Sequence, residues 1–173
     1  MLMKFILFLS FLVTLSFASI SNINSFEADF KQIITDEKDK QLTYSGHLIA
    51  SKPQNALWHY MKPIKKEIYI RGYSITIIEP EIEQVIIKEL SSKFDFFRMI
   101  KKAKKVGKSK YTTINKDIKF TIYLEKNLIK SISYIDEFDN NVEVIFTNQK
   151  QNKKINTNIF YPIIPEEYDI VRD

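Results

Sequence analysis

The chain has 173 residues, of which 45% are hydrophobic and 13% aromatic, so it is long enough for one domain with a sizeable core and short for two. It contains no cysteine, which excludes disulfides, a thiolate nucleophile and cysteine-based metal sites. Its net charge of +5 comes mostly from lysines spread along the chain, a pattern typical of a solvated surface, and no nucleic-acid partner is expected.

The N-terminus has the pattern of a secretory signal peptide. Lys4 precedes an almost unbroken apolar run over 5–17, and Ser16-Phe17-Ala18 places small residues where a signal peptidase reads the chain. We expect residues 1–18 to be removed, because the apolar run is short for a membrane span. An uncleaved anchor is the alternative. Residues 19–173 are expected to form a single exported, soluble domain.

The mature chain opens with an alternating pattern. Apolar residues from Phe26 to Phe30 alternate with charged ones, which predicts a half-buried strand. A charged turn over 36–40 leads into a second strand, where Gly46 interrupts the apolar face and indicates a bulge or a close backbone approach. The segment 51–55 contains proline and is predicted to be a turn.

Short strands with turns between them continue along the chain and predict a mainly β (α+β) protein built on one large antiparallel sheet or an incomplete barrel. Several strands are apolar on both faces, which indicates that both faces of the sheet are covered. The predicted strands are 56–61, 67–71, 73–79, 83–89, 111–114, 118–125, 128–136, 142–149 and 155–161.

One internal helix is predicted over 92–105. Phe94, Phe97 and Ile100 recur at three-residue spacing, lysines occupy the other faces, and Gly107 is a suitable stop. One helix cannot fill the mouth of a large curved sheet, so we expect an apolar cavity that the helix partly plugs. A closed core containing the same helix is the alternative.

No catalytic site, metal site or cofactor motif is predicted. His47 and His59 lie in strand patterns without the helical spacing of a zinc protease, and the chain has only three glycines, too widely spaced for a phosphate-binding loop. Glutamates over 79–83 are typical of a solvated loop. Lys62, Lys65 and Lys66 are interpreted as a solvated turn, with docking to an acidic surface as the alternative. We therefore expect a protein that is not an enzyme.

Short motifs follow one another in order along most of the mature chain. They are Phe26-x-x-x-Phe30-x-Gln32, Gly46 with Leu48, Lys52-Pro53, Trp58-x-Tyr60, Gly72, Glu79-Pro80 with Glu83-Gln84-Val85, Asp136 before a strand over 142–146, and Phe160-x-Pro162 with Tyr168-Asp169-Ile170. In this order and spacing the chain resembles the periplasmic outer-membrane lipoprotein carrier family, the LolA-like proteins.

The resemblance implies an incomplete, strongly curved antiparallel β-barrel, or half-barrel, with a helical cover over a hydrophobic cavity. It also implies a periplasmic chaperone that shields the acyl chains of lipoproteins released from the inner membrane and delivers them to an outer-membrane acceptor. The expected partners are triacylated lipoproteins, an inner-membrane ABC transporter and that acceptor, and the carrier is expected to be a monomer. A periplasmic lipid or lipoprotein sensor and a carrier of free lipid are the alternatives.

The resemblance also suggests site residues. Trp58 matches the family tryptophan that lines the cavity, and Lys52 falls where the family often has an arginine that holds the cover closed and helps release. Lysine keeps the positive charge of arginine but lacks its planar guanidinium group with several hydrogen-bond donors. The family's N-terminal helix is largely missing before Ser25. The expected cargo-binding residues are Phe30, Leu48, Trp58, Tyr60, Phe94, Phe97 and Ile100.

Overall fold

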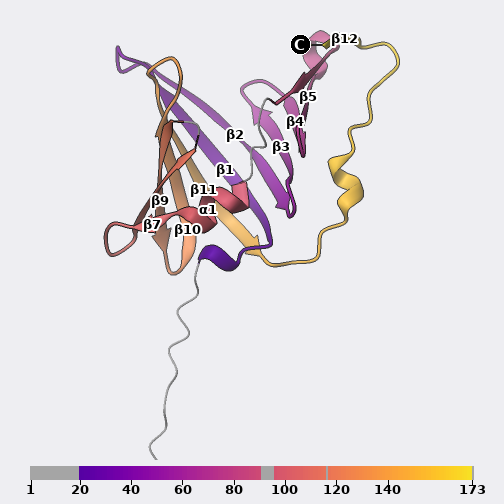
Figure 1. Ribbon diagram of the computed structural model, residues 1–173. Helices are drawn as coiled ribbons and strands as arrows, with labels where there is room; N and C mark the ends of the chain where they lie inside the picture. The colour runs from indigo at the N-terminus through magenta and orange to yellow at the C-terminus, as the bar shows by residue number, and fades with distance from the viewer. Residues whose placement is uncertain (1–19, 91–95, 116, 173) are drawn as a thin grey trace, which may run out of the picture.

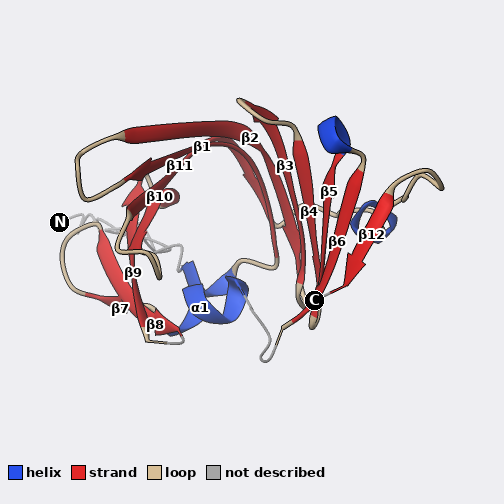
Figure 2. Ribbon diagram, turned by 90° about the horizontal axis from the view of Figure 1, so that it is seen from above, coloured by secondary structure: helices blue, strands red, loops and turns tan. Residues whose placement is uncertain are grey.

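The computed structural model describes residues 20–90, 96–115 and 117–172. In these residues, twelve strands form one sheet in the order β12-β6-β5-β4-β3-β2-β1-β11-β10-β9-β8-β7. The sheet curves strongly without closing (Figures 1 and 2). The expected signal peptide over 1–18 and Phe94 lie outside the described residues, and no described helix has the length and apolar character needed to cross a membrane.

The strands are β1 Ser25–Thr35, β2 Gln41–Ser51, β3 Asn55–Lys62, β4 Lys66–Arg71, β5 Ser74–Glu79, β6 Gln84–Glu89, β7 Lys104–Lys105, β8 Lys110–Asn115, β9 Ile118–Glu125, β10 Leu128–Ile135, β11 Asn141–Gln151 and β12 Asp169–Arg172. The helices are α1 Phe96–Lys102 and three short 3-10 helices, η1 Ile20–Asn22, η2 Pro80–Ile82 and η3 Thr157–Phe160. The predicted curved, helix-covered sheet is confirmed.

The alternation that predicts β1 is also confirmed, and it decides which side of the sheet becomes the interior. Phe26, Ala28 and Phe30 are buried, whereas Lys31 is exposed. Strand β1 pairs antiparallel with both β2 and β11, which places its apolar side chains at the centre of the concave face. Alternate residues of the neighbouring strands face the same side of the sheet and build one continuous inner core.

The structure differs from the sequence prediction at three places. The segment 155–161 is not a strand, because it contains η3. The Asn156 side chain accepts a hydrogen bond from the Asn158 amide, so this local cap uses a backbone donor that a strand needs for pairing within a sheet. The helix ends at Lys102, because Lys104 and Lys105 pair with β8. Strand β12 was not predicted, and it pairs with β6 in parallel, so the sheet is not purely antiparallel.

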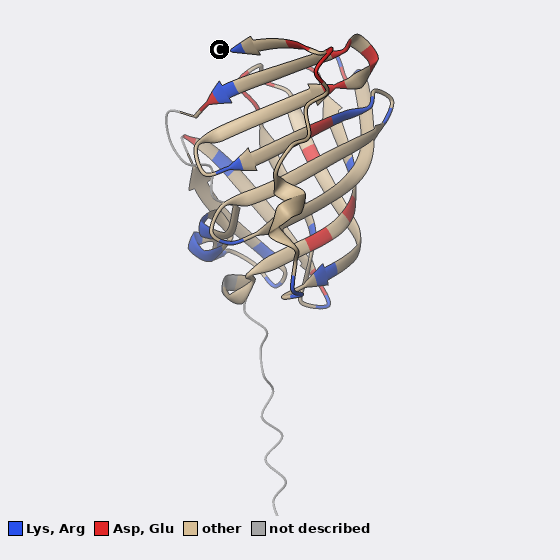
Figure 3. Ribbon diagram, turned by 90° about the vertical axis from the view of Figure 1, so that its right-hand side faces the viewer, with Lys and Arg blue, Asp and Glu red and all other residues tan. Residues whose placement is uncertain are grey.

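The outer face of β3–β6 carries a second, smaller core. Tyr69, Ile78 and Val85 are buried there against Ile164 and Tyr168 of the C-terminal segment. This segment crosses the outer face of the sheet (Figure 3), and η3 lies against β3 and β4. The prediction that strands with two apolar faces are covered on both sides is therefore confirmed for this part of the sheet.

Candidate functional site

The concave face of the sheet and helix α1 together form the candidate site. Helix α1 lies at the open side of the curved sheet (Figure 2). Its Phe97, Met99 and Ile100 are buried, and Lys101 and Lys102 at its end are exposed. Phe97 and Ile100, whose three-residue spacing predicts the helix, therefore lie on the face of α1 that packs against the sheet.

The structure brings the predicted cargo-binding residues together. Phe30, Leu48, Tyr60, Phe97 and Ile100 are buried in one cluster, and the half-buried Trp58 packs against it. These side chains come from β1, β2, β3 and α1, which are separated in the sequence but share the inner face. The resulting surface is apolar and continuous.

Aromatic rings at the centre of this cluster meet edge to face. The Phe30 ring centroid lies 5.1 Å from that of Trp58 and 5.0 Å from that of Tyr60, with interplanar angles of 71° and 74°. Such pairs are favourable beyond their buried area and fix the orientation of each ring. Phe96 of the helix lies with its ring centroid 5.6 Å from that of Phe26, which joins α1 to the same aromatic group.

Helix α1 plugs the interior more completely than the sequence predicts. A cavity of about 20 Å³ remains, lined by Leu48, Ala50, Gln54, Asn55, Ala56, Trp58, Ile70, Phe96 and Phe97. This volume is close to that needed for one water molecule and far below the 300 Å³ or more of an ordinary ligand pocket. The structure is thus a closed conformation, in which the side chains of α1 occupy the apolar hollow.

Lys52 contacts the N-terminal segment of the domain. Its Nζ atom donates to Asn24 Oδ1 at 2.7 Å, and its backbone amide donates to the Asn24 carbonyl at 3.0 Å. Asn24 follows η1, which lies against α1. In this conformation Lys52 therefore holds the N-terminal segment, which lies beside the helix.

Sequence reasoning missed the polar end of the inner face. Lys66 is not part of a solvated turn: its Nζ lies 4.8 Å from the Tyr60 ring centroid and 5.4 Å from that of Tyr44. The Tyr60 hydroxyl donates to Gln32 Oε1 at 2.9 Å, and burial raises the pKa of this hydroxyl. Strand parity could have found Lys66, because it lies two residues before the inward Ile68.

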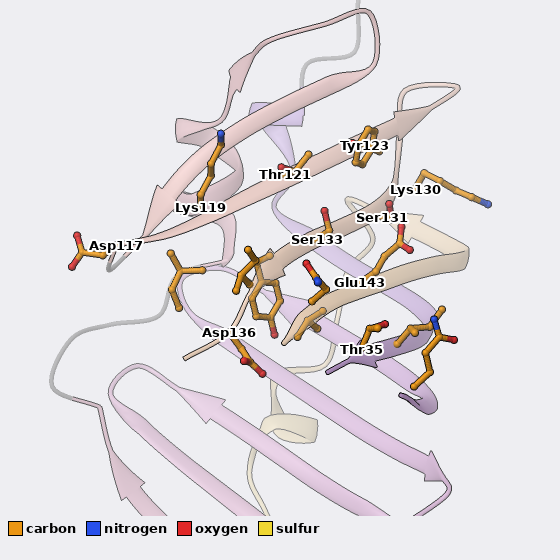
Figure 4. Close-up of a pocket in the computed structure, with 17 residues that line it drawn as sticks. Thr35, Asp117, Lys119, Thr121, Tyr123, Lys130, Ser131, Ser133, Asp136 and Glu143 are labelled. Atoms are coloured by element: carbon orange, nitrogen blue, oxygen red, sulfur yellow. The ribbon is translucent and has the colours of Figure 1, made fainter. Parts of the chain in front are cut away.

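A second hollow lies on the outer face of β9–β11 and does not suit an apolar ligand. It measures about 1150 Å³. Figure 4 shows Thr121, Ser131, Ser133 and Glu143 along its floor, with Lys119 and Lys130 at its sides. These hydroxyl and charged groups are hydrated in the open groove, so it cannot keep water away from an acyl chain.

The histidines lie outside the hollow. His47 Nδ1 is 2.7 Å from Asp29 Oδ1, and its Nε2 is 3.5 Å from Glu27 Oε1. Hydrogen bonds from Asn148 and then His47 hold the pKa of the Asp29 carboxyl below its usual range. Across the described ranges, no group of three His, Asp or Glu side chains is arranged to hold a metal ion.

Known proteins resemble the chain in both sequence and fold. The family model "Outer membrane lipoprotein carrier protein LolA" matches residues 21–96. An outer-membrane lipoprotein carrier protein of Campylobacter jejuni is 44% identical over 168 residues, covering 97% of this chain and 98% of the relative. One from Wolinella succinogenes is 31% identical over 159 residues, covering 91% and 92%.

Solved structures support the fold alone. A LolA superfamily protein from Nitrosomonas europaea aligns with a TM-score of 0.53 at 10% identity, covering 82% of this chain and 91% of that one. An uncharacterised conserved protein from Thermus thermophilus aligns with a TM-score of 0.53 at 10% identity, covering 88% and 93%.

Proposed function

Since the chain belongs to the outer-membrane lipoprotein carrier protein family, we propose that it binds the acyl chains of lipoproteins on the inner face of its sheet and carries them across the periplasm. The observation that supports this site is the single apolar cluster shared by α1 and the concave face. The ligand takes the place of the helix side chains, and the transfer involves binding without a chemical step.

Acyl chains need such a carrier because their exposure to water is costly. Each CH₂ group gains about 0.8 kcal/mol on burial, so one long chain exposed to water costs on the order of 10 kcal/mol. An acylated protein therefore stays in a membrane unless another apolar surface receives the chains. The inner face offers that surface, since Leu48, Phe30 and Ile70 are buried within it.

Loading requires α1 to leave the hollow, because the cavity beside its Phe96 and Phe97 measures only about 20 Å³. Phe97 and Ile100 pack on the sheet through the same kind of apolar contact that an acyl chain makes. When the helix moves away, the cargo therefore packs against the sheet in its place, and the closed and loaded states remain close in free energy. This balance allows release as well as binding.

The proposed route follows the family. The carrier receives triacylated lipoproteins from an inner-membrane ABC transporter, passes them to an outer-membrane acceptor and works as a monomer. Support for these partners and for the periplasmic location is the family membership alone.

The test is release of lipoproteins from inner-membrane preparations by purified carrier. Trp58→Glu and Phe97→Glu place a charge in the hollow and are expected to abolish release, while Trp58→Ala, which leaves the site uncharged, reduces it several-fold. Ile163→Glu is the matched control, because Ile163 is 90% exposed on the outer segment. Circular dichroism confirms that each variant is folded. Undiminished release by folded Trp58→Glu would contradict the proposal.

A further inference from the structure

The inner face changes character along its strands. At the α1 end it is lined by Ala56, Ile70 and Trp58, and at the other end by Tyr44, Tyr60 and Lys66. Tyr60 pairs with Lys66, and Ala56 pairs with Ile70, so the two ends are joined by the same pair of strands. The face is therefore amphipathic along its length.

Lys66 is a cation on this face without an acidic partner. Its ammonium group contacts the rings of Tyr44 and Tyr60, and among the described residues no carboxylate lies within ion-pair distance of it. The neighbouring Glu67 accepts a hydrogen bond from Tyr69 and lies near His59. A half-buried ammonium held by aromatic faces retains its donors for an anion.

The spacing of the two ends matches the length of a lipid. Lys66 precedes Ile70 by four residues of β4, which corresponds to about 13 Å at the rise of a strand. The hydrocarbon of one bilayer leaflet is about 15 Å thick. A lipid with its acyl chains under α1 therefore places its headgroup beside Lys66.

We infer that Lys66 and Tyr44, positioned beside the ring of Tyr60, bind the phosphate of an anionic glycerophospholipid whose acyl chains occupy the hollow beneath α1. Charge complementarity favours this ligand, because the acylated end of a lipoprotein is joined by neutral amide, ester and thioether groups. The hydroxyl of Tyr44 makes no hydrogen bond within the described part of the chain and supplies a donor beside the ammonium. The inference rests on the proposed function, since it uses the same opening of α1.

A comparison of two lipids with identical acyl chains separates the contribution of the headgroup to binding from that of the chains. Dioleoyl phosphatidylglycerol and dioleoylglycerol are added from neutral-detergent micelles, and displacement of a neutral fluorescent probe reports their binding to the full chain. The wild type is expected to bind phosphatidylglycerol about tenfold more tightly, as one charge-assisted hydrogen bond allows. Lys66→Gln loses this preference and Lys66→Arg retains it. Lys65→Gln, which changes an exposed lysine on the adjoining turn, leaves it unchanged.

Three results would overturn the inference, and they differ in whether they also contradict the proposed function. Equal binding of the two lipids by the wild type, or an unchanged preference in Lys66→Gln, rejects the phosphate site and leaves the carrier function intact. Inorganic phosphate that competes as well as the lipid rejects the assignment to a lipid. Failure of the neutral probe and of both lipids to bind the chain at all rejects the opening of α1 as well, and with it the proposed function.

Discussion

At the scale of single residues, Gly46 shows how closely the strands approach behind the hollow. A Cβ atom at this position would lie 2.0 Å from the His59 carbonyl oxygen and 2.9 Å from the Phe30 ring. The register of β2 against β3 shifts between Ser45 and Gly46, which is a bulge. Both features follow from the interruption of the apolar face by a glycine, as the sequence predicts.

Replacing this glycine tests the close approach. Gly46→Ala is expected to lower the free energy of unfolding by about 3 kcal/mol, because rigid backbone must move to admit the methyl group. Urea denaturation measures the change. Gly107→Ala is the control, since its Cβ would meet its nearest neighbour, Lys110 Cβ, at an ordinary 3.5 Å. Equal stability of the two variants would show that the strands separate freely at Gly46.

At the scale of elements, α1 is suited to leave the sheet. It has seven residues, fewer than an isolated helix needs to be stable in water. Its stability therefore depends on packing Phe97, Met99 and Ile100 against the sheet. An apolar ligand that packs on the same surface competes directly with the docked helix.

Weakening the docked helix is expected to strengthen ligand binding. Ile100→Ala lowers the free energy of unfolding by about 2–4 kcal/mol through loss of packing. It raises the apparent affinity for a neutral fluorescent acyl probe, because the open state becomes more populated. Urea denaturation and probe titration measure the two effects, and Lys101→Ala, on the exposed face of α1, changes neither. A fall in both stability and affinity would contradict the role of α1 as a competing cover.

Strands in which apolar and polar residues alternate regularly could be predicted from the sequence. Segments whose structure depends on pairing with a distant part of the chain could not. Local patterns located β1 and β9, but β12 exists through its parallel pairing with β6, far back in the chain. The resemblance to the family suggested Trp58 as a residue of the site, and the alternation in β1 indicated that Phe30 is on the apolar face. Lys66 was missed because three nearby lysines suggested a turn, and the volume left by α1 depends on how the helix docks, which local sequence does not encode.

At the scale of the whole molecule, the two faces of the sheet are covered in different ways. The outer face of β3–β6 is covered by the long C-terminal segment, with Phe160 1% exposed and Arg71 stacked 3.6 Å from the Tyr161 ring centroid. Among the described residues, the inner face is covered by α1 and by the N-terminal segment with η1, whose Ile20 and Ile23 are buried in the same core. In the proposed function, the sheet is the frame, α1 is the cover that moves away, and the cargo binds only to the inner face.

The most direct test of this account is photo-crosslinking of the carrier to a lipoprotein. A photoreactive phenylalanine analogue is placed at Trp58 in the hollow or at Ser133 in the outer groove, and the loaded complex is irradiated. Crosslinks to the acyl chains are expected from position 58 and not from position 133, and none are expected with the non-acylated form of the same lipoprotein. Crosslinks mainly from position 133, or equal crosslinking without acylation, would contradict binding of the acyl chains beneath α1.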